Sequence, residues 1–352
     1  MAYTDIDKPT DYFESKIWTG NGSSQNISLD FAPNWVWIKQ RSGTRYHNLQ
    51  DTIRGTGLQL FSNATSADNS DSTNITAFNS DGYSLGAGQN VNNSSSTYVG
   101  WSWKAGTSFT NDASGTGIGS IDSAGSASTA SGFSIVSWTG TGSAGTIAHG
   151  LGKLPKMIIA KQRNTARNWV VYFLDTTIAN NNVNNYLELD TTAASTGDSG
   201  GRWGSYANYS TTTFGVGTDN GTNQSGGTYI AYVFSDIKAF SKIGKYVGNG
   251  NADGTFVYTG FKPAFVMWKK TNGASEWIMV DSKRNTSNEV DKLLRANQSS
   301  AENTYGACDF LSNGWKFRDG DTDFQASGDT YLYMAFAENP FVTSTGVPAT
   351  AR

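Results

Sequence analysis

The chain repeats one pattern three times, and this repetition limits its fold more than any other feature does. An aromatic residue followed by a Gly-x-Gly turn opens each segment, at residues 18–22, 138–142 and 246–250. A proline-led apolar run with a lysine six positions after the proline comes next, at 33–39, 155–161 and 263–269. Each segment then closes on Thr, Tyr and an aliphatic residue, at 97–99, 228–230 and 330–332. Three diverged copies of one unit predict three similar domains, an organisation typical of binding and scaffold proteins.

The apolar residues within each segment follow a period of two, which indicates strands. Val99, Trp101 and Trp103 alternate with small or polar residues, and the closing runs near 230 and 332 repeat this pattern. The proline-led runs are apolar on both faces, as expected of central strands that are covered on both sides. Asp81-Gly82 and Asn313-Gly314 lie between apolar runs and predict hairpins with type I′ turns. Only residues 288–295 could form two turns of helix.

These patterns, with 40 glycines and 13% aromatic residues, predict an all-β protein of tandem β-sandwiches. A jelly-roll or a concanavalin-like sandwich with little helix fits each segment. Six regions are expected: an N-terminal docking arm, a first sandwich, a flexible Gly/Ser-rich linker, two further sandwiches and a C-terminal tail, at residues 1–11, 12–106, 107–131, 132–244, 245–341 and 342–352. Because the junction near residue 244 is abrupt, the second and third sandwiches should pack together while the first stays more independent.

Charge and cysteine content exclude several classes of protein. A net charge of −3 without basic runs gives no electrostatic footprint for nucleic acid or for a membrane surface. No apolar run is long enough to cross a bilayer. The lone Cys308 cannot form an internal disulfide. The first residues lack the basic and apolar parts of a secretory signal, so we expect synthesis in a cytoplasm followed by retention or release by lysis.

The residues that could carry chemistry have simpler structural interpretations. His47 and His149 stand in different segments without metal-ligand spacing around them, and we expect them on the surface or in turns. Asp319, Asp321 and Asp323 could bind calcium, although a solvated turn is the preferred interpretation. Aspartates recur after the third strand of each segment, where turn formers are common; these are Asp51, Asp175 and Asp281. We therefore predict no catalytic residue, no metal site and no cofactor.

Trp203 and Tyr206 are the binding candidates because they lie in a glycine-rich insert of the second segment. A tryptophan in such a loop could stack on a sugar or fill a pocket of a partner. It could equally fold back onto its own domain. The sequence does not decide between these two interpretations.

The repeated phrases resemble a group of bacteriophage virion proteins that is common in marine phages. The resemblance covers almost the whole chain and rests on residues 6–13, 18–22, 35–41, 132–140, 149–152, 309–314 and 335–341. It implies a structural component of the particle, often linked to tail fibres, and it brings no catalytic residues.

We therefore expect a non-enzymatic virion protein, in the first place a tail-fibre or receptor-binding component. Its expected partners are other virion proteins, further copies of itself, and a glycan or protein of the host surface. A capsid decoration protein or head fibre is the alternative, since no heptad-bearing shaft is present. A polysaccharide depolymerase is the third alternative, and it would need clustered carboxylates in a cleft.

Overall fold

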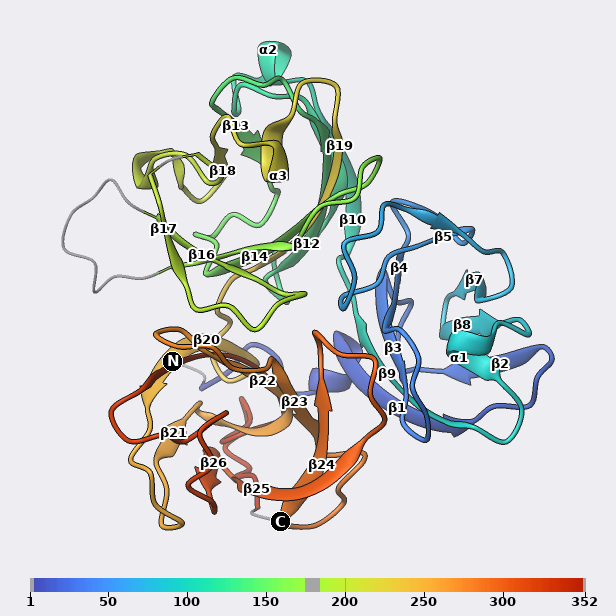
Figure 1. Cartoon of the computed structure of the whole chain (residues 1–352), viewed down its shortest axis with the longest axis vertical. Helices are drawn as coiled ribbons and strands as arrows, with labels where there is room; N and C mark the ends of the chain where they lie inside the picture. Colours follow the sequence, from blue (N-terminus) through green and yellow to red (C-terminus); the bar gives the residue numbers. More distant parts are fainter. Residues whose placement is uncertain (1–2, 175–183, 200, 351–352) are drawn as a thin grey trace.

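The computed structural model describes residues 3–174, 184–199 and 201–350, and their regular structure is almost entirely β (Figure 1). The all-β prediction is confirmed. The strands gather into three units arranged around a common centre, as Figure 1 shows. From the strand pairing we define module 1 as residues 12–106, module 2 as residues 107–240 and module 3 as residues 241–341. The third module thus begins slightly before the predicted boundary at residue 245, because its first strand starts at Ser241.

Module 1 is a sandwich of two sheets. One sheet has the order β1 (Phe13–Thr19), β9 (Thr97–Trp103), β3 (Trp35–Gln40) and β4 (Asn48–Asp51). The facing sheet has the order β2 (Gln25–Ser28), β8 (Gly82–Leu85) and β7 (Ile75–Asn79). Val36 and Ile38 of the first sheet pack on Ile27 and Tyr83 of the second in one buried cluster. The short elements are β5 (Leu58–Gln59), β6 (Asn69–Ser70) and α1 (Gln89–Asn92), and η1 (Pro9–Asp11) precedes the module.

Module 2 has a larger sheet and a small facing sheet. The larger sheet runs in the order β10 (Thr107–Asn111), β11 (Ser123–Ser128), β12 (Phe133–Thr139), β19 (Thr228–Phe234), β14 (Met157–Gln162), β15 (Val170–Phe173), β16 (Asn184–Glu188) and β17 (Thr196–Asp198). The facing sheet pairs β13 (Gly145–Ala148) with β18 (Thr213–Val216). The helical elements are α2 (Ala113–Thr116), η2 (Tyr206–Asn208) and α3 (Asn220–Asn223).

Module 3 forms one strongly curved sheet that nearly closes. Its order is β20 (Ser241–Val247), β27 (Thr330–Pro340), β22 (Phe261–Lys270), β23 (Ile278–Asp281), β24 (Val290–Arg295), β25 (Asn303–Leu311), β26 (Gly314–Phe317) and β21 (Phe256–Tyr258). The helix predicted at residues 288–295 is wrong, because this segment is strand β24. Val290, Leu293 and Leu294 are buried in the core, across a register shift between Val290 and Lys292, and that burial outweighs a weak helical pattern.

The three modules share one strand register around their central strands. Trp35 pairs with Trp103, Met157 with Phe234, and Phe265 with Phe336. The central strands β3 and β14 are buried along their whole length, and β22 is buried at all but one position, as the two-sided apolar pattern predicts. The repeat in the sequence is therefore a repeat in three dimensions.

The linker predicted at residues 107–131 is wrong. This segment forms β10, α2 and β11, and β11 extends the sheet of module 2 along the edge of β12. Small residues make this close pairing feasible: a Cβ atom at Gly125 would lie 2.0 Å from the carbonyl oxygen of Ile135. The segment thus gains stability through backbone hydrogen bonds, and Ile121 and Phe109 add packing against the core of module 2.

Both predicted hairpins form, but their turns differ from the expected type. In the first, β7 and β8 are joined by Ser80 and Asp81, and Gly82 already belongs to β8, paired with Asn79. Neither Ser80 nor Asp81 has the positive φ that a type I′ turn requires. Gly82, with φ +143°, is needed because a Cβ atom there would lie 2.0 Å from the carbonyl oxygen of Ile27.

The expected independence of the first module is also wrong, because all three modules meet in one aromatic core. Trp35 of module 1 stacks on Tyr232 of module 2 with ring centres 4.0 Å apart. Phe13 of module 1 stacks on Phe336 of module 3 with ring centres 4.9 Å apart. Burying large aromatic faces on the common centre holds the modules together as one body.

The predicted N-terminal arm packs on the chain itself. Tyr3 Oη donates to the carbonyl oxygen of Gly260, and Thr4 and Ile6 are buried. Near the other end of the chain, the backbone N–H of Ser344 donates to Asp7 Oδ1 at 2.7 Å. Residues 3–7 therefore lie against module 3 and the segment that follows it, while Lys8 and Thr10 bond to Asp30 of module 1.

Candidate functional site

The modules contact one another through three seams with the same backbone geometry. We call them seam 1/2, seam 2/3 and seam 3/1 after the modules that meet there. In each seam, the backbone N–H of one module donates to a Thr or Ser carbonyl of the other. The three pairs are Arg167 to Thr65, Ser275 to Thr192 and Arg45 to Ser299, at 2.9, 2.9 and 3.0 Å. A second N–H···O bond completes each seam, from Asp68 to Arg163, Ser195 to Thr271 and Glu302 to Arg41, at 2.7, 2.8 and 2.8 Å.

A buried lysine of the central strand supports this geometry in seams 1/2 and 2/3, whereas Lys39 Nζ donates to the carbonyl oxygens of Gln40 and Gly43 within module 1. Lys161 Nζ donates to the carbonyl oxygens of Thr65 and Arg167, at 3.0 and 2.8 Å. Lys269 Nζ likewise reaches the carbonyl of Thr192 at 3.2 Å. Burial lowers the pKa of Lys39, Lys161 and Lys269 to about 8. These lysines, which mark the repeat in the sequence, are structural hydrogen-bond donors.

Seam 1/2 carries a chain of charges. Arg54 Nε donates to Asp51 Oδ2 at 2.6 Å, and both side chains are fully buried. The same guanidinium reaches Asp68 at 3.2 Å, and Asp68 in turn accepts from Arg163 of module 2 at 2.8 Å. Tyr232 of module 2 donates its hydroxyl to Asp51 at 2.9 Å. The nearby carboxylates raise the pKa of Arg54 against the effect of its burial, so the guanidinium stays charged.

Seam 3/1 repeats this arrangement with different residues. Arg284 Nε donates to Asp281 Oδ2 at 2.5 Å, and Arg284 also reaches Glu302 at 3.1 Å. Glu302 accepts from Arg41 of module 1 at 2.9 Å, and Trp101 donates to Asp281 at 3.1 Å. The recurrent aspartates Asp51 and Asp281 are thus turn formers, as predicted, that also anchor seam ion pairs. Asp175, the third of them, lies outside the described residues.

Seam 2/3 departs from the other two. Ser195 stands where the other seams have Asp68 or Glu302, and Thr271 stands where they have Arg163 or Arg41. The backbones are as close as in the other seams, so the two shorter side chains leave space between the modules. A cavity of about 530 Å³ lies there. Its wall is formed by Phe173, Asn185, Ala194, Ser195, Lys245, Tyr246, Val247, Thr271, Asn272 and Thr330.

Some polar groups that line this cavity already have hydrogen-bond partners, and others do not. Asn272 is used, because its amide donates to Asp329 and its carbonyl oxygen accepts from the backbone of Thr330. Thr271 donates its hydroxyl to the carbonyl of Thr330 at 3.0 Å and keeps acceptor capacity. Among the described residues, no hydrogen-bond partner is found for the side chains of Asn185, Ser195 and Thr330. The cavity therefore offers uncommitted hydroxyl and amide groups.

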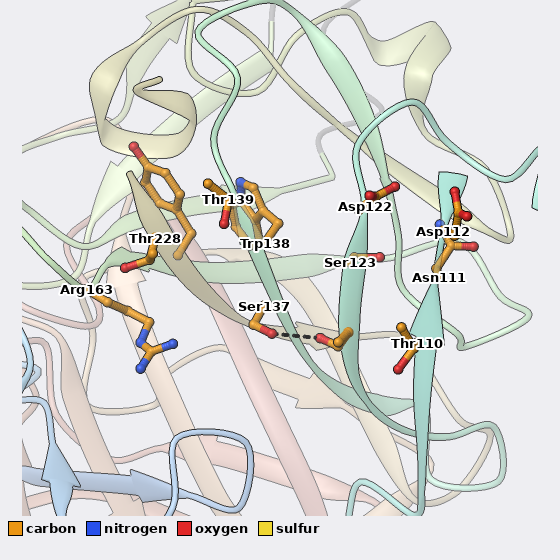
Figure 2. Close-up of a pocket in the computed structure, with 12 residues that line it drawn as sticks. Thr110, Asn111, Asp112, Asp122, Ser123, Ser137, Trp138, Thr139, Arg163 and Thr228 are labelled. Carbon is orange, nitrogen blue, oxygen red and sulfur yellow. Dashed lines mark hydrogen bonds between the residues drawn. The ribbon is translucent and has the colours of Figure 1, made fainter. Parts of the chain in front are cut away.

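A second hollow, of about 350 Å³, lies on module 2 and is shown in Figure 2. It lies at strand ends of module 2 that are equivalent to those lining the seam cavity in module 3. Trp138, Arg163 and Thr228 correspond there to Tyr246, Thr271 and Thr330. Its charged groups are engaged, since Arg163 pairs with Asp68, and Ser137 donates to the carbonyl of Ala124 at 3.0 Å, the dashed line of Figure 2. Its two carboxylates accept hydrogen bonds from the backbone of α2.

Those two carboxylates, Asp112 and Asp122, accept hydrogen bonds from backbone N–H groups at the start of α2. They are capping groups that hold a local turn. This leaves the seam 2/3 cavity as the better candidate for binding.

Of the two binding candidates named from the sequence, the structure removes Trp203. Its side chain is fully buried in module 2, where it packs against Tyr172 and Phe214. Tyr206 is 38% exposed and stacks on Tyr209 with ring centres 6.4 Å apart. The loop thus turns its tryptophan inward, and neither residue lines the cavity at seam 2/3.

The acidic loop forms a turn. Asp319 accepts from the backbone N–H of Asp321 at 2.8 Å, and Asp321 accepts from that of Asp323 at 2.7 Å. In the part of the chain that the structure describes, no group of three or more metal-ligating side chains is found.

Both histidines are buried, so the prediction of surface or turn positions is wrong for His47. Its Nδ1 accepts from Trp37 Nε1 at 2.8 Å, and burial holds its pKa well below the usual value. It occupies the position that Trp169 and Trp277 hold at the other seams, eight residues after the repeat lysine. His149 precedes a turn but is also buried, and burial lowers its pKa to about 4.

The fold can now be compared with known proteins. Residues 8–340 match DUF7483, described as a domain of unknown function. The chain belongs to the DUF7483 family. A search of curated proteins returns no match. Across the described residues, no helix of this DUF7483 protein has the length and apolar character needed to cross a bilayer.

The sequence carries a signal for the seams in the residue two positions after each repeat lysine, which the apolar periodicity does not reveal. Two residues after each repeat lysine stand Arg41, Arg163 and Thr271. Aligning the three segments on that lysine would have marked the third copy as the exception. The acidic partners Asp68 and Glu302 lie in loops of different length, and only the fold brings them to the arginines.

Proposed function

We propose that this DUF7483 protein is a non-enzymatic structural component of a bacteriophage particle, acting as a tail-fibre or receptor-binding component in host attachment. The observation that carries the proposal is the joining of three β modules into one body with a single chemically distinct seam. A body whose modules are joined by hydrogen bonds at three seams holds its loops and its cavity in defined relative positions. The virion resemblance of the repeated phrases supports the same assignment.

Adhesion requires a surface whose shape is kept outside the cell. Ion pairs buried in the seams and the shared aromatic core supply this without a disulfide, since the lone Cys308 is buried. Moving one module relative to another would break these ion pairs and expose the shared aromatic core, which makes domain motion costly. The proposed partners are other virion proteins, further copies of this chain, and a glycan or protein on the host surface.

A capsid decoration protein or head fibre is the second candidate. The compact arrangement of the three modules favours it, because the described residues form no elongated shaft (Figure 1). A polysaccharide depolymerase is a third candidate. The buried carboxylates Asp51 and Asp281 give it no support, because both are held in ion pairs with arginine.

Immunogold labelling of intact particles tests the proposal. Antibody raised against the folded protein should decorate the tail and block adsorption to host cells. Label restricted to capsid faces, with normal adsorption, would replace the adhesion assignment by the decoration assignment. Particles without any label would refute both. Release of reducing sugar from host polysaccharide by the purified protein would favour the depolymerase.

A further inference from the structure

We infer that the cavity at seam 2/3 is a binding site for one or two neutral sugar units of a surface glycan. The inference rests on the proposed attachment function and gives that function a location. It depends on three observations: the residues that replace the charge pair, the free polar groups that line the space, and the hydrogen bonds that join its walls.

The space arises from substitution at two equivalent positions. In seams 1/2 and 3/1, an arginine and an acidic side chain occupy these positions and pair across the seam. In seam 2/3, Thr271 and Ser195 occupy them, while the backbone N···O distance of 2.8 Å matches the 2.7 and 2.8 Å of the other seams. The modules have therefore not moved apart, and the two shorter side chains enlarge the space between them. At about 530 Å³, it lies in the range of small-molecule sites, roughly 300–1,000 Å³.

The lining suits a ligand that carries many hydroxyl groups. The hydroxyls of Ser195 and Thr330 can each donate and accept, and the Asn185 amide offers both functions. Thr271 adds an acceptor. Phe173 and Tyr246 supply apolar surface beside these groups, as a sugar ring needs for its C–H faces.

The same lining disfavours other classes of ligand. An anion would require dedicated cationic donors, but the lysine of the lining, Lys245, has its ammonium 5.5 Å from the centre of the Phe173 ring and has other interactions. An apolar ligand would leave three uncommitted polar side chains without partners, which costs free energy. A neutral sugar unit needs no cationic donor, and its hydroxyl groups can form hydrogen bonds with these polar side chains.

The walls come from two modules that are held in register. Seam 2/3 keeps its backbone bonds through Thr192 and Thr271, and Trp277 Nε1 donates across it to the carbonyl of Glu188 at 2.9 Å. A site held in place before binding loses little conformational entropy when a ligand enters. The cavity is thus a fixed groove between two rigid sheets.

The test is to give seam 2/3 the charge pair of the other seams. The double variant Ser195→Asp/Thr271→Arg should narrow the cavity and place an ion pair across it, because backbones at the same distance already carry that pair at Asp68 and Arg163. The matched control, Ser24→Asp/Thr107→Arg, places the same charges at exposed positions. A second variant, Ser195→Ala/Thr330→Val, leaves the space open and removes two of the free hydroxyls.

Binding is measured on an array of immobilised neutral hexose, N-acetylhexosamine and uronate oligosaccharides, followed by titration calorimetry with the strongest binder. Wild type and the matched control should bind one neutral class equally. The charge-pair variant and the hydroxyl-deletion variant should each lose at least about tenfold in affinity. Thermal unfolding of each variant at the wild-type temperature establishes that the seam is intact.

The outcomes separate the site from the attachment function. Equal binding by all folded variants would place the sugar elsewhere and overturn the inference while leaving attachment in place. A blank array with wild-type protein would also overturn it, and particle labelling would still decide the attachment role. Uronate binding that survives the hydroxyl deletion would refute the neutral class.

Discussion

The buried ion pair of seam 1/2 allows a quantitative test of how the modules are joined. Asp51 and Arg54 are fully buried with N and O atoms 2.6 Å apart. Removing one partner of such a pair leaves an uncompensated charge and costs about 3–5 kcal/mol. We therefore expect Arg54→Met to reduce the free energy of unfolding by about 3–5 kcal/mol. Asp51→Asn should reduce it by less, because Arg54 keeps Asp68 at 3.2 Å.

The double variant should be far less destabilised than the sum of the two single variants. Without either charge, no ion is left uncompensated in the seam, so Asp51→Asn/Arg54→Met should cost about as much as one single substitution. The coupling energy should reach about 3 kcal/mol, the upper end for residues in one network. Guanidinium unfolding followed by tryptophan fluorescence measures all four proteins.

The control is an exposed pair in the same chain. Lys8 and Asp11 lie 3.1 Å apart with side chains 59% and 49% exposed. The cycle Lys8→Met, Asp11→Asn and their combination should give a coupling below about 1 kcal/mol. Additive effects at Asp51 and Arg54, or single losses no larger than those of the exposed pair, would refute the reasoning.

Three further predictions follow from burial and close approach. His149 is buried with its pKa lowered to about 4. The unfolded state therefore binds a proton at higher pH than the folded state does, and stability is lost as pH falls from about 6.5 toward 4. The loss should be roughly 3 kcal/mol, and unfolding titrations at pH 7 and 4 should show that His149→Asn removes it. Trp35→Ala should cost about 3–5 kcal/mol, because its ring stacks on Tyr232 of another module; a loss below about 1 kcal/mol would contradict a shared core. Gly82→Ala should cost more than about 1 kcal/mol by pushing a Cβ atom onto the carbonyl of Ile27, and amide exchange in β2 should accelerate; unchanged protection there would contradict this.

The repeat and the period-two pattern were enough to predict the all-β class and the central strands. Those signals are local, since Trp35–Gln40 must be covered on both faces wherever the module sits. The segment 107–131 could not be predicted this way, because its pairing depends on backbone hydrogen bonds and small side chains that leave no hydrophobic pattern.

The candidate site was beyond sequence reasoning for a different reason. Ser195 and Thr271 are far apart in the chain and unremarkable in type. Their meaning appears only when the other two seams show which charged residues they replace. Trp203 was a candidate because its loop is rich in glycine, yet it is buried, since a large ring near apolar neighbours gains more by packing inward.

The stacking of Phe13 on Phe336 has a consequence for how the protein is made. A ribosome adding about 5–20 residues per second needs on the order of 20–70 s for the whole chain. During most of that time, the aromatic face of the first module has emerged while its last partner has not been synthesised. The nascent chain must therefore carry an exposed patch of Phe13, Trp35 and Trp103 for many seconds. We expect chaperones to be needed during synthesis, and truncation before residue 336 to yield aggregates rather than a smaller folded protein.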